Sequence, residues 1–311
     1  MPRALGQPRY GSVAGRLRRW ELGPGDAGYP ELLESYGDRP PRLRGLGDLT
    51  ALAGECLSVV GSRKATPYGL ACARMAGRVA AECGITIVSG GAVGCDREAG
   101  MAALEAGGRG VVVPGCGADV LYPRGSDELF SQTLERGGCV VSLEHWGMQP
   151  TRYTFVRRNR LIAALSRSLV VCEAARPSGT FGTATAAAEM GRHVYAVPGS
   201  IFSPLSAGTN WLIETGASIV TDEQALEGLV ALDYGRLRMA SGRTAGERGR
   251  LMDALVASPM DVDGIASLLG LDVPSALALV AEHEASGSLC RLADGRFAPT
   301  KEFLLGQNGV R

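Results

Sequence analysis

Seven short apolar runs, separated by Ala-rich stretches, dominate the chain from residue 56 to about residue 230. They read CLSVV, ITIVS, GVVVP, CVVSL, SLVVC, HVYAV and ASIV. Runs that are apolar at nearly every position are typical of strands buried on both faces, and the stretches between them can supply crossover helices. The pattern therefore predicts an α/β fold with a doubly wound, mostly parallel sheet. Ligands are expected at the carboxyl ends of its strands.

The two ends of the chain break this pattern. Gly, Pro and Arg are frequent near the N-terminus and predict one short helix before Arg-Pro-Pro. Near the C-terminus, three helical stretches and two short strands around Asp294-Gly295 are typical of a winged helix. We expect a partly irregular N-terminal extension (1–50), an extended Rossmann-like domain (51–230), a linker (231–248), a small winged-helix domain (249–300) and a tail (301–311).

Composition confines any anion-binding site to a local cluster. The chain has 32 basic and 32 acidic residues, so its net charge is zero and attracts a polyanion only weakly over long range. Its eight cysteines include no Cys-x-x-Cys pair, which favours reduced core thiols in a cytoplasmic protein. The sequence shows no signal peptide and no apolar run of roughly 18 residues, so we expect no membrane partner.

Three loops that follow predicted strands combine glycine with hydroxyl side chains. Their candidate phosphate-binding residues are Gly61, Ser62, Arg63, Ser89, Gly90, Gly91, Ser178, Gly179 and Thr180. Glycine permits close backbone approach, and the amides at the start of a following helix attract anions. The first two loops lack the dinucleotide pattern Gly-x-Gly-x-x-Gly, and no Walker A sequence occurs, so we expect no cofactor. Several such strand ends on one sheet edge favour a long anion groove over a pocket for one phosphate.

Residues 152–168 are the most informative stretch. They contain five arginines and lie between Glu144 and Glu173 with no acidic residue in between. Arginine mixed with aromatic side chains suits a nucleic-acid backbone with unstacked bases. The candidate phosphate ligands here are Arg157, Arg158, Asn159 and Arg160, and the candidates for base stacking are Phe155 and, in the third loop, Phe181.

No catalytic or metal-binding pattern emerges. The three histidines are scattered, and neither a Ser-His-Asp order nor metal-ligand spacing is present. Asp96 and Glu189 would form an acid/base pair only if the fold joined them. We therefore expect a protein that binds its ligand without catalysis.

The predicted winged helix is acidic. Residues 247–311 hold six basic and nine acidic residues. The third helix, which usually reads the major groove, carries Glu282, His283 and Glu284 but no Arg or Lys. Such a surface is poorly suited to a phosphate backbone. We expect this unit to contact protein or to regulate the main domain.

Taken in order, the motifs resemble those of the DNA-processing protein A (DprA, or Smf) family over about residues 28–298. They read VVGSRKATPYG, ITIVSGGAVGCD, YPRG, RRNRLIAALS, VVCEAARPSGTFGTA, VYAVPGSIFSPLSAGTN and LIETGASIVT. The resemblance implies a Rossmann-like domain that binds single-stranded DNA, protects incoming strands in natural transformation and helps load the recombinase RecA. It also implies a homodimer formed through that domain.

When the family's functional residues are matched to this sequence by position, the resemblance assigns the three loops and the basic run to DNA binding. It also places Asp96 beside the second loop and adds Asn210 to the DNA-binding residues. The sequence departs from the family pattern at Val93, where Arg is usual, and at Gly100, where His is frequent. Both departures reduce the polarity of the expected groove.

Two other functions remain open from the sequence. Phosphoribohydrolases that cleave nucleoside monophosphates use the same Rossmann variant with Pro-Gly-Gly-x-Gly-Thr-x-x-Glu, which PSGTFGTATA resembles. Ala186, however, takes the place of the Glu, and the loop carries an inserted residue. A sensor domain for a small nucleotide, with the winged helix as its output, is the other alternative.

Overall fold

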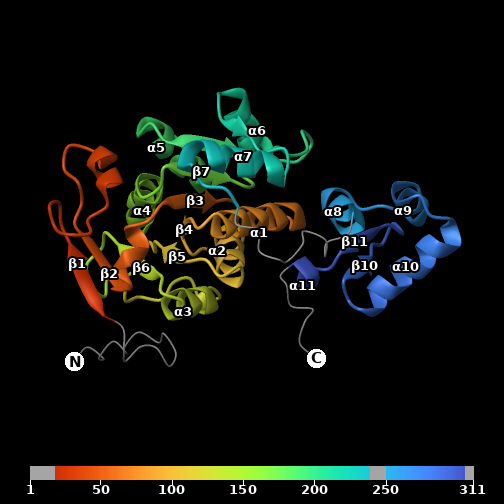
Figure 1. The fold of residues 1–311 in the computed structure, drawn as a ribbon, viewed down its shortest axis with the longest axis horizontal. Helices are drawn as coiled ribbons and strands as arrows, with labels where there is room; N and C mark the ends of the chain where they lie inside the picture. The colour runs from red at the N-terminus through yellow and green to blue at the C-terminus, as the bar shows by residue number, and fades with distance from the viewer. Residues whose placement is uncertain (1–17, 239–249, 305–311) are drawn as a thin grey trace. The chain divides into compact units, whose positions relative to one another are not determined.

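The computed structural model describes residues 18–238 and 250–304, which fall into two compact units (Figure 1). The first unit contains a large sheet covered by helices, and the described part of the second contains three helices, a small hairpin and a short final helix.

The first unit is built on a nine-stranded sheet of order β1-β2-β6-β5-β4-β3-β7-β8-β9. Its strands are β1 (Arg19–Leu22), β2 (Leu43–Gly47), β3 (Cys56–Val60), β4 (Thr86–Ser89), β5 (Gly110–Val112), β6 (Cys139–Ser142), β7 (Ser168–Val171), β8 (His193–Ala196) and β9 (Ser218–Ile219). The seven strands from β3 to β9 are parallel, and β1 and β2 add an antiparallel edge beside β6. All seven apolar runs are strands, which confirms the predicted doubly wound, mostly parallel fold.

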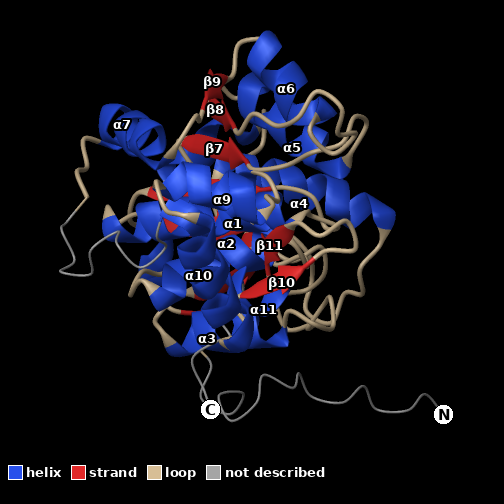
Figure 2. Ribbon diagram, turned by 90° about the vertical axis from the view of Figure 1, so that its right-hand side faces the viewer, coloured by secondary structure: helices blue, strands red, loops and turns tan. Residues whose placement is uncertain are grey.

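Helices cover both faces of this sheet. They are α1 (Pro67–Glu82), α2 (Cys95–Glu105), α3 (Asp127–Glu135), α4 (Arg152–Ala164), α5 (Gly179–Glu189), α6 (Ala207–Glu214) and α7 (Glu223–Tyr234), with short 3₁₀ helices η2 (Glu31–Tyr36) and η3 (Leu49–Leu52). Right-handed crossovers place α1, α2 and α3 on one face and α4, α5 and α6 on the other. An ion pair of 2.6 Å between Arg78 and Glu223 holds α7 beside α1. Figure 2 shows α7 and the pair α5 and α6 on opposite sides of the last strands.

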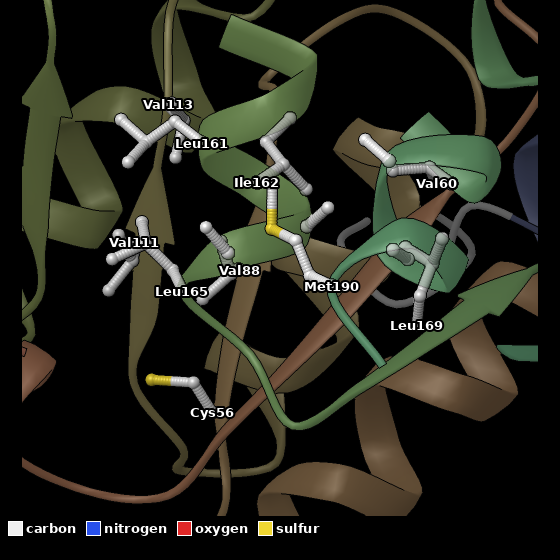
Figure 3. Packing of buried hydrophobic residues seen from close by; sticks show 14 of the residues in the cluster. Cys56, Val60, Val88, Val111, Val113, Leu161, Ile162, Leu165, Leu169 and Met190 are labelled. Atoms are coloured by element: carbon white, nitrogen blue, oxygen red, sulfur yellow. The ribbon is translucent and has the colours of Figure 1, made fainter. Parts of the chain in front are cut away.

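The core forms because both faces of the central strands are apolar. Every residue of β3 is buried. Leu161, Ile162 and Leu165 of the α4 segment lie over the sheet, as Figure 3 shows. The polar member of β3, Ser58, is satisfied by donating to the carbonyl of Ile162 at 2.7 Å. This packing fixes α4, and with it the basic run, against the middle of the sheet.

The structure adds detail to three segments outside the predicted sheet strands and helices. The N-terminal extension is less irregular than expected, because β1 and β2 within it complete the sheet. The predicted linker begins too early, since residues 231–234 are the last turn of α7. Tyr234 ends that helix in a buried position and donates to the carbonyl of Cys56 at 2.8 Å. The predicted tail begins with a short helix, α11 (Lys301–Leu304).

The second unit has the element order expected from the sequence. Helices α8 (Arg250–Ala257), α9 (Val262–Leu269) and α10 (Val273–Ala285) precede the antiparallel strands β10 (Leu289–Arg291) and β11 (Phe297–Pro299). Leu255, Ile265 and Val280 belong to its separate core. The winged-helix assignment itself stays a prediction. Within the described ranges, no single helix is long and apolar enough to cross a membrane, although α9 and α10 together, bent by 107°, meet that test by length and composition.

Candidate nucleic-acid interface

The predicted loops converge where the strand order reverses. Strand β3 pairs with β4 on one side and with β7 on the other, so the chain leaves the sheet in opposite directions from neighbouring strands. Such a switch point opens a crevice at the carboxyl ends of the strands. Here the Thr180 hydroxyl donates to the Gly61 carbonyl at 3.1 Å. The first and third candidate loops are therefore joined directly.

A cavity of about 230 Å³ opens beside the first two loops. Its lining residues are Arg63, Gly90, Ala92, Val93, Gly115, Tyr122, Pro123, Phe155 and Arg158. The centres of the Phe155 and Tyr122 rings are 6.0 Å apart. The Arg63 guanidinium lies 5.1 Å from the centre of the Phe155 ring. Aromatic surface and a cation thus face the same space.

Beneath this cavity lies a buried ion pair. Arg158 Nη1 is 3.6 Å from Asp96 Oδ2, and each side chain is 7% exposed. Asp96 also accepts the Gly90 amide at 3.2 Å. Burial raises the pKa of the Asp96 carboxyl above its usual range, and the Arg158 charge opposes that shift. Since arginine stays protonated in proteins, the guanidinium brings a fixed positive charge to the cavity floor.

Two glycines create the space for these side chains. A Cβ on Gly90 would come within 1.4 Å of Arg158 Nη1, and a Cβ on Gly115 would come within 2.6 Å of the Phe155 ring. Any other residue at either position would displace the guanidinium or the ring. The second loop therefore requires Gly90 because Arg158 packs against it.

Three predicted site residues carry unused polar atoms. Ser89 Oγ, Ser178 Oγ and Arg158 Nε are buried and have no hydrogen-bond partner among the described residues. An unsatisfied buried polar group costs about 1–3 kcal/mol. These atoms, at the end of β4, at the start of α5 and on α4, are therefore able to form a hydrogen bond with a ligand or a water.

The basic run is less available than its sequence suggests. Arg157 lies 3.0 Å from Glu144, and Arg160 lies 3.1 Å from Glu189 while also donating to the Tyr36 carbonyl. With Arg158 held by Asp96, each of the three candidate arginines has a carboxylate beside it. The expected patch of free positive charge is therefore largely neutralised by residues distant in the sequence.

Three other predicted site residues, Asn159, Asn210 and Phe181, also make contacts within the protein. Asn159 donates to the Gly179 carbonyl at 3.1 Å, and the Asn210 side chain makes two 3.0 Å hydrogen bonds to the Gly199 backbone. The Phe181 ring lies 4.9 Å from the Trp211 ring and packs on the core. In the structure these side chains hold the loops in place.

Two exposed cations outside the basic run lie on the loops that follow β3 and β7. Arg63 and Arg176 are exposed, and neither has a carboxylate within 4 Å in the described part of the chain. The guanidinium of Arg176 instead stands 4.4 Å from the Trp211 ring. Sequence reasoning selected Arg63 but missed Arg176, and it also missed Tyr122. Tyr122 could have been found from the sequence, because it is an aromatic residue within the YPRG motif.

The two carboxylates considered as an acid/base pair have separate partners. Asp96 pairs with Arg158, whereas Glu189 pairs with Arg160. Residues 18–238 and 250–304 contain no group of three or more His, Cys, Asp or Glu residues placed to hold a metal ion.

A model of the family DNA recombination-mediator protein A matches residues 21–230. The chain is 43% identical over 202 residues to Protein Smf of Escherichia coli, covering 65% of this chain and 54% of that protein. It is 40% identical over 198 residues to the DNA processing protein DprA of Streptococcus pneumoniae, covering 63% of this chain and 69% of that protein. The matched region thus spans little more than half of the E. coli relative.

Solved structures give the same result for the fold. The X-ray structure of DNA processing protein A from S. pneumoniae aligns with a TM-score of 0.62 and 38% identity, covering 67% of this chain and 72% of that one. DNA processing protein A from Helicobacter pylori, described for its single-stranded DNA binding mode, aligns with a TM-score of 0.63 and 26% identity. That alignment covers 70% of this chain and 98% of the H. pylori chain.

Proposed function

The chain belongs to the DNA recombination-mediator protein A family, and from that premise we propose that it binds single-stranded DNA along the carboxyl edge of its parallel sheet. The groove runs from the cavity beside Phe155, past Gly61, Ser62 and Arg63, to the loop that opens α5. Phosphates lie against the loop amides and Arg63, and an unpaired base enters the cavity.

The observation that carries this proposal is the cavity itself. It combines the faces of Phe155 and Tyr122 with the cations Arg63 and Arg158, and Ser89 nearby retains an unused hydroxyl. Aromatic side chains stack on any base, while arginine offers donors to phosphate and is weakly hydrated. A base paired within a duplex cannot enter such a cavity without leaving its stack, so the site favours single strands.

On this basis the protein acts as a recombination mediator that protects incoming strands in natural transformation. We further propose that it helps load RecA, forms a homodimer through the sheet domain and works in the cytoplasm. The acidic second unit contacts protein or regulates the sheet domain. Family membership supports the proposed RecA and dimer contacts, and the acidic charge of residues 247–311 supports the proposed role of the second unit.

We also propose that the protein is not an enzyme. Ala186, which stands where phosphoribohydrolases carry a glutamate, is buried within α5. The nearest alternative carboxylate in that helix, Glu189, is paired with Arg160. Because α5 offers no unpaired carboxylate, this helix lacks the principal group that would stabilise an oxocarbenium-like centre.

An oligonucleotide titration tests the first proposal, and an assay with AMP tests the second. Fluorescence anisotropy with labelled single- and double-stranded oligonucleotides of one sequence, repeated across salt concentrations, is expected to show preference for the single strand. Log affinity is expected to fall with log salt at roughly −0.7 per phosphate neutralised. Equal affinity for both forms would contradict the proposal. Release of adenine from AMP under the same conditions would support the phosphoribohydrolase alternative instead.

A further inference from the structure

Two apolar side chains project from the groove edge at a point that the family resemblance does not assign to DNA. Ile201 is 83% exposed and Phe202 is 91% exposed, the highest values among the large exposed hydrophobic residues described. Full exposure of such side chains is unfavourable, since burying one contributes about 1.5–3 kcal/mol. We call these two residues the apolar tip.

The apolar tip is held by a formed turn. The Ser203 amide donates to the Ser200 carbonyl at 3.0 Å, which places Ile201 and Phe202 at the two central positions of a four-residue turn. The Ser200 hydroxyl also accepts the Phe202 amide at 3.3 Å. Asn210 secures the base of the loop through its paired bonds to Gly199. The backbone is thus shaped to present these side chains.

The loop is also continuous with the candidate groove. It leaves the carboxyl end of β8, which pairs with β7. At the start of α6, the Gly208 amide donates to the Ala174 carbonyl at 2.8 Å, so this loop is bonded to the one that follows β7. That second loop continues to Thr180, which is bonded to Gly61. Neighbouring strands are about 4.8 Å apart, so the carboxyl end of β8, from which the tip loop leaves, lies roughly 10 Å along the edge from β3.

The loop after β7, which neighbours the tip loop, supplies a cation on the same edge of the sheet. Arg176 extends from the loop after β7, is exposed and stands over Trp211. Trp211 lies on α6, directly after the tip loop, and its ring faces Phe181. An apolar surface near a free cation matches an unpaired base with its attached phosphate, because stacking and charge act on neighbouring parts of one ligand.

We propose that the apolar tip is a second base-binding site. Phe202 and Ile201 stack on unpaired bases, or insert between them, where the strand leaves the groove. Arg176 contacts the adjoining phosphate. This inference rests on the proposed function and extends it beyond the switch point. The cavity at Phe155 is concave and receives a base, whereas the tip is convex and separates bases.

The test compares variants of the full chain on a 20-mer of deoxythymidine by fluorescence anisotropy across salt. Phe202→Ala is expected to weaken binding about five- to 100-fold, the range given by loss of one stacked base. Its salt dependence is expected to remain that of the unmodified protein, because no charge is removed. Arg176→Ala is expected to weaken binding and flatten the slope. Leu277→Ala, which removes a half-exposed leucine from the second unit, is the matched control and is expected to change neither.

Phe202→Trp supplies a direct readout. It is expected to retain affinity, and its added tryptophan emission, measured as the difference from the unmodified protein, is expected to be quenched by the oligonucleotide as bases stack on it. Unchanged affinity in Phe202→Ala together with unquenched emission would overturn the inference. A change in self-association alone in Phe202→Ala would show a protein interface and would overturn it as well. Loss of affinity in Arg63→Ala in the same series would leave the proposed function intact. That function would be refuted if the unmodified chain bound no single strand, or bound single and double strands with equal affinity.

Discussion

Arg158 and Asp96 form a buried ion pair, 3.6 Å apart, at the floor of the candidate base cavity. The pair joins α4 to the start of α2, and Gly90 passes over it with no room for a side chain. Taking two charges out of water is costly, and their attraction repays this only with good geometry and further hydrogen bonds. Here Arg158 Nε lacks a partner. The arrangement therefore favours ligand binding at some cost in stability.

The first prediction concerns the stability of this pair. Asp96→Ala is expected to lower the free energy of unfolding by about 3–5 kcal/mol, because it leaves Arg158 charged and buried without compensation. Replacing both residues, as Asp96→Leu with Arg158→Met, is expected to restore most of that loss and to abolish tight single-strand binding. Urea unfolding followed by circular dichroism measures the first effect, and anisotropy measures the second.

The control is the more exposed ion pair between Arg160, which lies on the same helix as Arg158, and Glu189 of α5. Glu189→Ala breaks the contact with Arg160, whose side chain is 38% exposed, and is expected to change stability little. Equal destabilisation by Asp96→Ala and Glu189→Ala would show that burial of the first pair has no special consequence.

The second prediction ranks two arginines. Arg63 has no carboxylate partner among the described residues, whereas Arg157 lies beside Glu144. Arg63→Ala is therefore expected to weaken single-strand binding for all sequences alike and to flatten the salt slope by about 0.7, the share of one phosphate. Arg157→Ala is expected to have a smaller effect on both quantities. Anisotropy titrations at four salt concentrations measure the slope.

A matched charge control lies at the opposite edge of the sheet. Arg236 is exposed and follows Tyr234, which is bonded to the first residue of β3. Arg236→Ala also removes one positive charge and is expected to leave the salt slope unchanged. A slope that fell as much in this variant as in Arg63→Ala would show that net charge alone is responsible.

The sequence predicted the parallel strands because each is apolar along most of its length. It did not predict β1 and β2, since an edge strand such as Arg19–Leu22 is mostly exposed and carries polar residues that resemble a loop. Antiparallel edge pairing depends on contacts with β6, about 100 residues away, and short-range patterns contain no information about it.

For the candidate site, the sequence identified the backbone elements more accurately than the side-chain roles. Glycine and hydroxyl residues at strand ends gave the positions of the loops, because those requirements are local. The pairing of Arg158 with Asp96 and of Arg160 with Glu189 is set by how α4 packs on the sheet. Such packing brings together residues far apart in the chain, so an acid-free run in sequence did not remain acid-free in space.

The third prediction concerns pH and the amino-terminal edge of the sheet. Burial alone would raise the pKa of Asp233, but hydrogen bonds from Ser168, Tyr195 and His193 outweigh it and hold that pKa below its usual range. A carboxyl whose pKa is lowered on folding stabilises the protein fully above its unfolded pKa, about 3.9. That stabilisation is lost as the pH falls from there through the folded value.

Asp233→Asn is accordingly expected to lower stability at neutral pH and to reduce the loss of stability that occurs as the pH falls below about 4. Urea unfolding at several pH values measures this difference. The result is expected to be independent of DNA, because Ser168 and His193 begin their strands at the edge opposite the groove. An unchanged pH profile would contradict the assigned role of Asp233.

The fourth prediction compares two aromatic residues of α4, of which one lines the cavity and the other does not. Phe155 lines the cavity and lies 5.1 Å from the Arg63 guanidinium, whereas Tyr153, two residues earlier, is 70% exposed and does not line it. Phe155→Ala is expected to weaken binding of oligodeoxythymidine by about 1–3 kcal/mol, the contribution of one stacked base. Tyr153→Ala is expected to have a much smaller effect, and both variants are compared by anisotropy at one salt concentration. Phe155→Trp retains an aromatic face and tests whether the shape of the ring affects the affinity. Similar losses in the two alanine variants would place the strand along the exposed face of α4 and outside the cavity.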